Sequence, residues 1–320
     1  MQAKEPGKKR NPGWPDAVSR DGQESACSHL AFTHFNRSYT IRMAIVKAGT
    51  DTAGHPVNIF YEDWGQGNPV VLIHGWPLDH TMWEHQMVAL TGAGHRVIAY
   101  DRRGFGRSSR PWTGYDYDTL AADLNALMTE LDLHNATLVG FSMGGGEIAR
   151  YLNTYGDARV ARVAFVSAVP PFLLKTDDNP DGVPESVFEG MKKAIRDDRF
   201  AFLQSFAKSF YGVGLISQPV SQGVLDWNQT VTSLAAPNAT HDCVTAFSAT
   251  DFRADLAQVK VPTLVIHGDS DQTVPFEVSG ERTAKMIPQA ELKVYKGAPH
   301  GLFFTNKDEL NKDLLAFIGA

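Results

Sequence analysis

The sequence Gly-Phe-Ser-Met-Gly at residues 140–144 constrains the fold of this chain more than any other feature. It follows an apolar, strand-like run at Ala136–Val139 and precedes a segment of helical periodicity at Gly144–Tyr155. A serine in such a strand-to-helix turn needs small neighbours, because the tight turn brings backbone segments together and lifts the hydroxyl clear of the sheet. A chance match in an ordinary loop would lack the strand and the helix. The context therefore predicts a nucleophile elbow at Ser142.

The rest of the chain from Met43 onward alternates between β-branched apolar runs and segments of helical periodicity. Seven runs are predicted as strands, most of them too uniformly apolar to have a solvent-facing side: Val57–Tyr61, Val70–His74, Val97–Tyr100, Ala136–Val139, Val163–Ser167, Thr263–His267 and Leu292–Tyr295. Helices are predicted at Thr119–Leu131, Gly144–Tyr155 and Lys307–Phe317. Strands and helices in alternation predict a mostly parallel, doubly wound α/β sheet. A chain of 320 residues that is 43% hydrophobic can bury one large core of this kind.

The alternation stops between residues 170 and 251, which are predicted to form an inserted helical cap on a core of residues 43–169 and 252–320. Caps of this kind close over the carboxyl ends of the strands, where open α/β sheets bind ligands. Phe202, Phe206 and Phe210 recur at helical spacing within the insertion. Packing of a cap helix is the favoured interpretation for them, and direct contact with a substrate is the alternative. Phe206 and Phe210, together with Trp227, are the candidates for substrate contacts.

Residues 1–42 are rich in Pro, Gly, Lys and Arg and lack the apolar run of a secretory signal, so they are predicted to be a disordered leader. Its basic cluster at residues 8–10 is either an address or binding arm, or simply part of a solvated tail. The net charge of −6 and the scattered basic residues argue against nucleic acid as a partner. No apolar stretch approaches the length that crosses a bilayer.

The two cysteines, Cys27 and Cys243, lie far apart and outside any metal-binding spacing, which predicts neither a disulfide framework nor a zinc site. A cytoplasmic location and the absence of a cofactor are the expectations. The sequence leaves the oligomeric state open, and a homo-oligomer is compatible with it.

A serine nucleophile needs a base within hydrogen-bond distance, and this base must be held by a carboxylate. In a fold with such an elbow, the chain order is serine, acid, histidine. His300 follows the last predicted strand in a Gly- and Pro-flanked loop and is the predicted base. The acid is expected after Thr263–His267, where Asp269 and Asp271 compete. Asp269 directly follows a glycine and can cap the turn through its side chain, so Asp271 is the predicted acid and Asp269 the alternative.

The negative charge of a tetrahedral intermediate requires two backbone N–H donors. One is expected from Met143, which follows the serine, and the other from Trp76, in the loop after Val70–His74. His74 is a conceivable second base, but a brace of this turn is the favoured interpretation. The arginines at positions 102, 103 and 107 are expected to tie their loop to neighbouring carbonyls and carboxylates, in preference to binding an anionic substrate.

Several motifs together resemble the cofactor-free haloperoxidase and aryl esterase branch of the α/β hydrolases: His-Gly-Trp-Pro-Leu at 74–78, Tyr-Asp-Arg-Arg-Gly-Phe-Gly-Arg-Ser at 100–108, and the triple glycine before Glu147, with the loops of Asp271 and His300. The likeness extends from about Met43 to the C-terminus. The resemblance implies an α/β-hydrolase fold, no metal or haem, and a small ester or carboxylic acid as the substrate. It further implies hydrolysis of small aryl or alkyl esters, sometimes lactones. Perhydrolysis is also implied, in which peroxide replaces water and the released peracid oxidises halide.

Two other interpretations stay open: amide or carbon–carbon bond hydrolysis by the same triad, and a non-catalytic ligand-binding protein of this fold. Enzymes that open halides or epoxides have aspartate at the elbow, so Ser142 disfavours them. For perhydrolysis, Pro77 restricts the backbone of Trp76, whose carbonyl could then accept a hydrogen bond from peroxide. A proline that merely stiffens the turn is an equal alternative.

Overall fold

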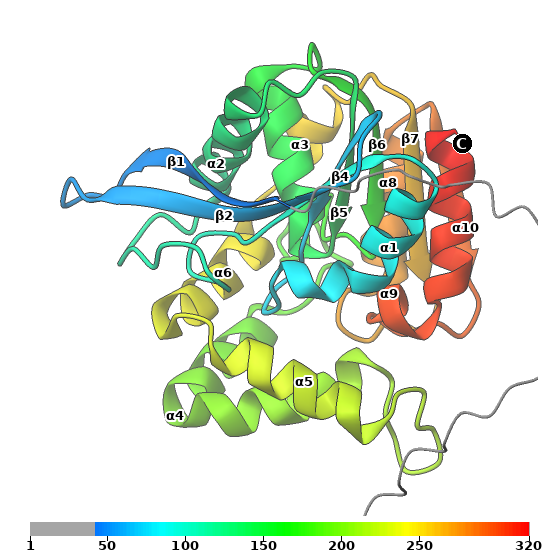
Figure 1. The fold of residues 1–320 in the computed structure, drawn as a ribbon. Helices are drawn as coiled ribbons and strands as arrows, with labels where there is room; N and C mark the ends of the chain where they lie inside the picture. The colour runs from blue at the N-terminus through cyan, green and yellow to red at the C-terminus, as the bar shows by residue number, and fades with distance from the viewer. Residues whose placement is uncertain (1–41, 320) are drawn as a thin grey trace, which may run out of the picture. The chain divides into compact units, whose positions relative to one another are not determined.

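The computed structural model describes residues 42–319, so the predictions for residues 1–41 lie outside the described part of the chain. An eight-stranded sheet runs through this part with the strand order β1-β2-β4-β3-β5-β6-β7-β8 (Figure 1). The strands are β1 (Arg42–Thr50), β2 (Pro56–Trp64), β3 (Pro69–Ile73), β4 (Arg96–Tyr100), β5 (Ala136–Phe141), β6 (Val160–Val166), β7 (Thr263–Gly268) and β8 (Ala290–Tyr295). Strands β4, β3, β5, β6, β7 and β8 pair in parallel, which confirms the predicted doubly wound sheet.

Helices cover both faces of the sheet (Figure 1). One face carries α2 (Tyr117–Glu130), α3 (Met143–Tyr155) and α8 (Gly280–Met286), and the other carries α1 (Glu84–Gly92), α9 (Leu302–Thr305) and α10 (Lys307–Ile318). Successive residues of β3 point to alternate layers. Val71 and Ile73 join the core beneath α2 and α3, whereas Val70 and Leu72 join the core beneath α1 and α10. Burial on both faces explains why the central strands are apolar at every position.

Two strands differ from the prediction of buried parallel strands. β2 is antiparallel to both of its neighbours, β1 and β4. It follows β1 through a tight turn in which the Asp51 N–H donates to the carbonyl of His55 at 2.8 Å. Such a short connection can join only antiparallel strands. β8 lies at one edge of the sheet, and its Leu292 and Val294 are 38% and 44% exposed.

The three predicted helices are present as α2, α3 and α10, whereas α1 was not predicted. α2 begins at Tyr117, two residues before the predicted start at Thr119, since Asp116 caps it by accepting the Thr119 N–H at 2.9 Å. In α1 a polar side chain occupies an inward position. Gln86 is buried and donates to the carbonyl of Phe303 at 3.1 Å, so the apolar periodicity of this helix is broken.

Between β6 and β7 the chain forms α4 (Glu185–Phe210), α5 (Gln222–Ser233), α6 (Pro237–Ala249) and the short α7 (Arg253–Leu256). α4 is interrupted at Asp198, whose φ of −156° and ψ of 90° are not helical. The Asp198 carboxylate accepts the N–H of Ala201 at 3.0 Å and so caps the second half of the helix. The loop before α6 is joined to the core, because the Ala236 N–H donates to the carbonyl of Gly104 at 2.8 Å. Among residues 42–319, no helix is long and apolar enough to cross a membrane.

Candidate active site

Ser142 lies at the turn between β5 and α3, with a backbone φ of 53° and ψ of −117°. L-amino acids rarely adopt this left-handed region, so the turn is strained. The two glycines that flank the turn allow its tight course. A Cβ atom on Gly140 would lie only 2.6 Å from the carbonyl oxygen of Gly144. The local geometry is that of a nucleophile elbow, which presents the serine hydroxyl at the carboxyl edge of the sheet.

The structure brings Ser142, His300 and Asp271 together in one line of hydrogen bonds. His300 Nε2 lies 3.0 Å from the Ser142 hydroxyl, and His300 Nδ1 lies 2.6 Å from Asp271 Oδ2. All three side chains are buried. With Nδ1 donating to the carboxylate, Nε2 is free to accept the serine proton, which is the arrangement that activates a serine.

The loops of Asp271 and His300 meet because they leave neighbouring strands at the same level. Gly268, at the end of β7, pairs with Tyr295, at the end of β8. Beyond the strands, the Ser270 N–H donates to the carbonyl of Ala298 at 3.2 Å. A Cβ on Gly268 would lie 2.1 Å from that carbonyl oxygen, so only glycine allows the approach. Gly268, which precedes the two aspartates in the sequence, therefore allows the loop of His300 to approach the end of β7.

Asp271 is held by backbone and side-chain donors. Its Oδ1 accepts the N–H groups of Thr273 at 2.9 Å and Val274 at 2.8 Å, and its Oδ2 lies 3.2 Å from His267 Nε2. Burial by itself raises the pKa of this carboxyl. The charge of His300 and the hydrogen bonds from His267 and His300 outweigh burial, so the pKa of Asp271 lies well below its usual range. Sequence reasoning treated His267 only as the end of a strand and gave no signal of this contact.

Asp269 occupies a different position. It is exposed, and its Oδ1 accepts the N–H of Gly297 at 2.6 Å. It therefore joins the loop of His300 to the end of β7 without touching the imidazole. The structure separates the two candidates: Asp271 contacts the histidine ring, and Asp269 caps the neighbouring turn.

The His300 ring lies between two aromatic rings. Phe141 packs against it with a centroid distance of 4.8 Å and Phe210 with one of 4.9 Å. The next N–H, that of Gly301, donates to the carbonyl of Phe210 at 2.8 Å. Phe210, a candidate for substrate contact, is thus placed against the histidine, where it fixes the ring and its loop.

The predicted oxyanion donors flank the serine. Met143 is the first residue of α3, and a Cβ on Gly75, next to Trp76, would lie 3.1 Å from the Ser142 Cβ. Within residues 42–319, neither the Met143 nor the Trp76 amide donates to another group. The Trp76 indole is fixed by a hydrogen bond of 3.1 Å from its Nε1 to the carbonyl of Thr240. Both amides are therefore available to an oxygen atom next to the serine.

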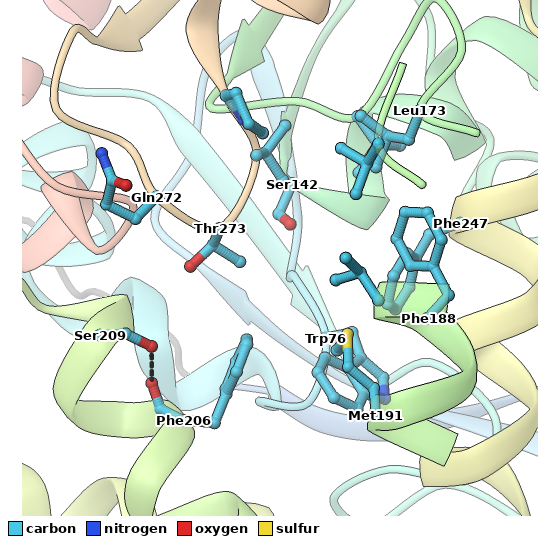
Figure 2. A pocket seen from close by; sticks show the side chains of 15 residues that line it. Trp76, Ser142, Leu173, Phe188, Met191, Phe206, Ser209, Phe247, Gln272 and Thr273 are labelled. Carbon is cyan, nitrogen blue, oxygen red and sulfur yellow. Dashed lines mark hydrogen bonds between the residues drawn. The ribbon is translucent and has the colours of Figure 1, made fainter. Parts of the chain in front are cut away.

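A cavity of about 390 Å³ opens onto the Ser142 side chain (Figure 2). Its walls are mainly apolar: α4 contributes Phe188, Met191 and Phe206, α6 contributes Phe247, and the loop after β3 contributes Trp76. This volume and lining suit a small organic substrate. Of the three predicted substrate contacts, Phe206 lines the cavity, whereas Trp227 lies at a separate depression beside Met82 and Phe304.

His74 has both ring nitrogens engaged. Nε2 accepts the Arg102 N–H at 2.9 Å, and Nδ1 lies 2.9 Å from the carbonyl oxygen of Gly75. Burial and the nearby Arg102 charge keep its pKa well below the usual value. A neutral, doubly bonded imidazole braces the turn and is not free to act as a second base.

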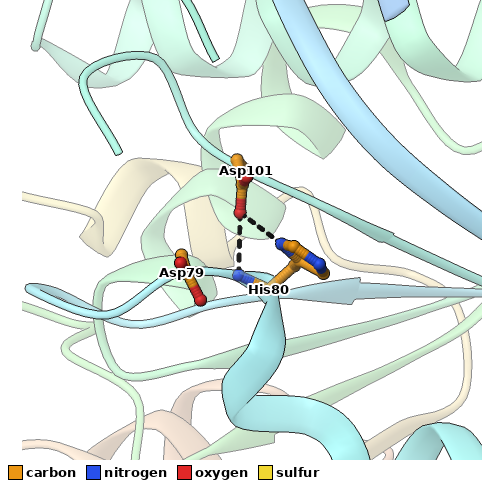
Figure 3. Close-up of side chains that lie close together, drawn as sticks. All are labelled: Asp79, His80 and Asp101. Carbon is orange, nitrogen blue, oxygen red and sulfur yellow. Dashed lines mark hydrogen bonds and ion pairs between the residues drawn. The ribbon is translucent and has the colours of Figure 1, made fainter. Parts of the chain in front are cut away.

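In the described part of the chain, one group has the residue types and spacing of a metal site: Asp79, His80 and Asp101 (Figure 3). Asp101 Oδ1 already accepts the His80 N–H at 2.9 Å and lies 2.6 Å from His80 Nδ1. Its Oδ2 accepts the N–H of Arg107 at 2.7 Å. Burial alone lowers the pKa of His80, but Asp101, Asp79 and Glu62 outweigh it and raise the pKa. The neighbouring carboxylates therefore favour the protonated form of His80.

Comparison with known proteins agrees with this fold. The family model for the alpha/beta hydrolase fold matches residues 68–307. The chain belongs to the α/β-hydrolase family. Within that family it is similar to haloperoxidases and related esterases. It is 47% identical to a non-heme chloroperoxidase of Kitasatospora aureofaciens, over 82% of this chain and 96% of that protein.

Two further proteins extend the comparison. The chain is 42% identical to a bifunctional esterase/perhydrolase of Acinetobacter calcoaceticus, over 84% of this chain and 99% of that one. The solved structure of a bromoperoxidase from Bacillus anthracis superposes with a TM-score of 0.84 at 50% identity, and covers 87% of this chain and 99% of that chain. The predicted resemblance to the cofactor-free haloperoxidase and esterase branch is confirmed.

Substitution of the two aspartates should give opposite results. Asp271→Asn removes the carboxylate that orients His300 and should lower kcat by about 10³- to 10⁴-fold. Asp269→Asn loosens a turn and should cost about 1 kcal/mol of stability while it spares most of the rate. Steady-state hydrolysis of p-nitrophenyl acetate and thermal melting of both variants provide the measurements. The reverse pattern would transfer the acid role to Asp269.

The depressed pKa of Asp271 predicts a pH-dependent contribution to stability. An unfolded aspartate titrates at about pH 4, so the carboxylate stabilises the fold above that pH and loses this effect as the pH falls through its lower folded value. The difference in unfolding free energy between wild type and Asp271→Asn should be largest above about pH 5 and shrink below about pH 4. Urea titrations across this range test it, and a difference that grows on acidification would contradict the assignment.

Proposed function

We propose that this protein is a serine hydrolase of small carboxylic esters, with Ser142 as nucleophile, His300 as general base and acid, and Asp271 as the carboxylate that orients the histidine. The observation that carries the proposal is the unbroken line of hydrogen bonds from Asp271 through His300 to Ser142 at the wall of an apolar cavity. A chance cluster of polar side chains would not combine this line with a strained elbow and two available amides.

The geometry supports an acyl-enzyme reaction. The Ser142 oxygen attacks the ester carbonyl while His300 Nε2 takes its proton, and the Trp76 and Met143 amides hold the resulting oxyanion. Collapse of this intermediate expels the alcohol, which receives the proton from His300. Water then attacks the acyl-enzyme, with His300 again as base, and releases the carboxylic acid.

The cavity supports a small, largely apolar acyl or aryl group as the part of the substrate next to Ser142. We take residues 170–251 as the cap, because α4 and α6 supply much of the cavity wall. Polar groups are present on the side of Ser209, Gln272 and Thr273 (Figure 2). An ester with an apolar body and one polar end fits this division of the lining.

Perhydrolysis is the second part of the proposal. Hydrogen peroxide attacks the acyl-enzyme in place of water, His300 accepts one peroxide proton and passes it to the Ser142 oxygen, and the acyl group leaves Ser142 as a peracid. The peracid then oxidises halide in solution, so this chemistry needs no cofactor at the site. The similarity to a protein named as an esterase/perhydrolase supports this step. The Trp76 carbonyl is the proposed acceptor for the second peroxide hydrogen.

Ser142→Ala should abolish ester hydrolysis and leave the fold intact, because alanine removes the hydroxyl at little change of volume. Hydrolysis of p-nitrophenyl acetate measures the activity, and circular dichroism checks the fold. Labelling by a fluorophosphonate probe separates an enzyme from a ligand-binding protein, since only an activated serine reacts rapidly. More than trace activity in the variant would overturn the assignment of Ser142.

Wild type should brominate monochlorodimedone in the presence of acetate, bromide and peroxide, and Ser142→Ala should not. Pro77→Leu relaxes the backbone restriction on Trp76 and should lower the perhydrolysis rate more than the esterase rate. A tenfold change in this ratio corresponds to about 1.4 kcal/mol in the transition state. Equal losses of both rates would contradict the role of the Trp76 carbonyl, and bromination no faster than in Ser142→Ala would contradict perhydrolysis itself.

A further inference from the structure

Two residues of the sequence motifs have no part in the proposed chemistry: Arg102, after β4, and Glu147, on α3. Arg102 Nε donates to Glu147 Oε1 at 2.5 Å, and its Nη2 pairs with the same oxygen. The Tyr100 hydroxyl donates to Oε2 at 2.6 Å. Both charged side chains are only 1% exposed. Apolar residues often replace such a buried pair without loss of stability, so stability alone does not account for it.

The Arg102 guanidinium also reaches the loop that carries Trp76. Its Nη2 donates to the carbonyl oxygen of His74 at 2.6 Å, while the Arg102 backbone N–H donates to His74 Nε2 at 2.9 Å. His74 Nδ1 is in turn bonded to the carbonyl of Gly75. One arginine thus holds both the peptide and the ring of the residue two positions before Trp76.

Glu147 holds the other end of the pair. It lies on α3 four residues after Met143, which is about one turn of helix. A helix is rigid over one turn, so the position of Glu147 fixes that of the Met143 amide. The ion pair therefore connects the loop of one proposed oxyanion donor to the helix of the other.

The residue before Arg102 holds the far end of the same loop. Asp101 Oδ1 binds both the N–H and the ring of His80, as Figure 3 shows. The adjacent residues Asp101 and Arg102 thus fix residues 74–80 at both ends. The contact between His80 and Asp101, in the group of Asp79, His80 and Asp101, therefore anchors the loop of residues 74–80.

We propose that Arg102 and Glu147 are positioning residues that set the placement of the Trp76 and Met143 amides relative to each other. The inference rests on the proposed function, because it requires an oxyanion at Ser142. Donors that are fixed in advance stabilise charge in the transition state, and displacement by about 1 Å weakens this effect strongly. Loss of the pair should therefore slow the chemical step and leave ground-state binding of the ester unchanged.

Glu147→Gln tests this with little change of shape, since the amide oxygen can still accept the Tyr100 hydroxyl. It should lower kcat by about tenfold or more and leave KM within about twofold. Inhibition by an aryl trifluoromethyl ketone, whose adduct with Ser142 carries the same oxyanion, should weaken by the same factor as kcat. A purely structural role would lower the melting temperature without this parallel loss.

The pair of Arg103 and Asp123 offers a matched control. Arg103 Nε and Nη2 each donate to the Asp123 carboxylate at 2.6 Å, and these side chains are 5% and 3% exposed. This pair joins the same loop to α2, and in the described part of the chain neither side chain forms a hydrogen bond or ion pair with residues 74–76. Asp123→Asn should reduce the melting temperature as Glu147→Gln does, but leave kcat and the ketone affinity within about twofold.

The double variant Arg102→Met with Glu147→Met removes both charges, so it avoids an unpaired buried charge and keeps the test valid if Glu147→Gln does not fold. It should show the same parallel loss of kcat and ketone affinity. If the folded variants match Asp123→Asn in both measurements while wild type hydrolyses esters through Ser142, the positioning role is overturned and the proposed function stands. Absence of hydrolysis through Ser142 in the wild type would overturn the proposed function as well.

Discussion

The strained backbone of Ser142 is the constraint on which the rest of the site depends. A left-handed conformation at a residue other than glycine costs about 1–3 kcal/mol, and it persists only where the surroundings hold it. Here the Ser142 N–H donates to the carbonyl of Val166 at 2.9 Å, and its carbonyl accepts the N–H groups of Gly145 at 3.1 Å and Val169 at 3.2 Å. These partners come from β6, α3 and the chain after β6. The elbow is therefore fixed by the same packing that forms the centre of the sheet, so the serine hydroxyl has one position relative to its neighbours.

The remaining groups reach this hydroxyl because parallel strands end at one edge of the sheet. β3, β5, β7 and β8 supply the loops of Trp76, Ser142, Asp271 and His300. The charged side chains at this edge are buried, but each of them has hydrogen-bond or ion-pair partners. The Asp271 carboxylate has two backbone N–H donors and two histidine rings around it, and Glu147 has a guanidinium and a phenol. Buried charges of this kind tolerate little movement, since a lost partner leaves an uncompensated charge. A rigid site is the consequence.

The sequence allowed the sheet, three helices and the Ser142, His300 and Asp271 positions to be predicted, because each depends on local pattern and chain order. It gave no access to contacts between distant segments that no motif or chain order connects. The packing of Phe210 on His300 joins residues 90 positions apart, and the Arg102 and Glu147 pair joins residues 45 apart. The helical repeat of Phe202, Phe206 and Phe210 predicts that these side chains share a face, but it cannot say which neighbour that face meets. The direction of β2 was missed for a related reason, as an apolar run carries no sign of the direction of its partner.

The position of α4 shows how substrate choice and catalysis are coupled in this molecule. The same helix lines the cavity with Phe206 and, one turn later, presses Phe210 against the His300 ring. The rings of the two phenylalanines pack against each other, with their centroids 5.8 Å apart. The carbonyl of Phe210 also holds the loop of His300, because it accepts the Gly301 N–H. A substitution in α4 that reshapes the cavity near Phe206 should therefore also move the imidazole of His300. Phe188 and Met191 line the cavity from the first half of α4, on the other side of the break at Asp198. Substitutions at these two positions should therefore change which substrates fit with the least effect on His300.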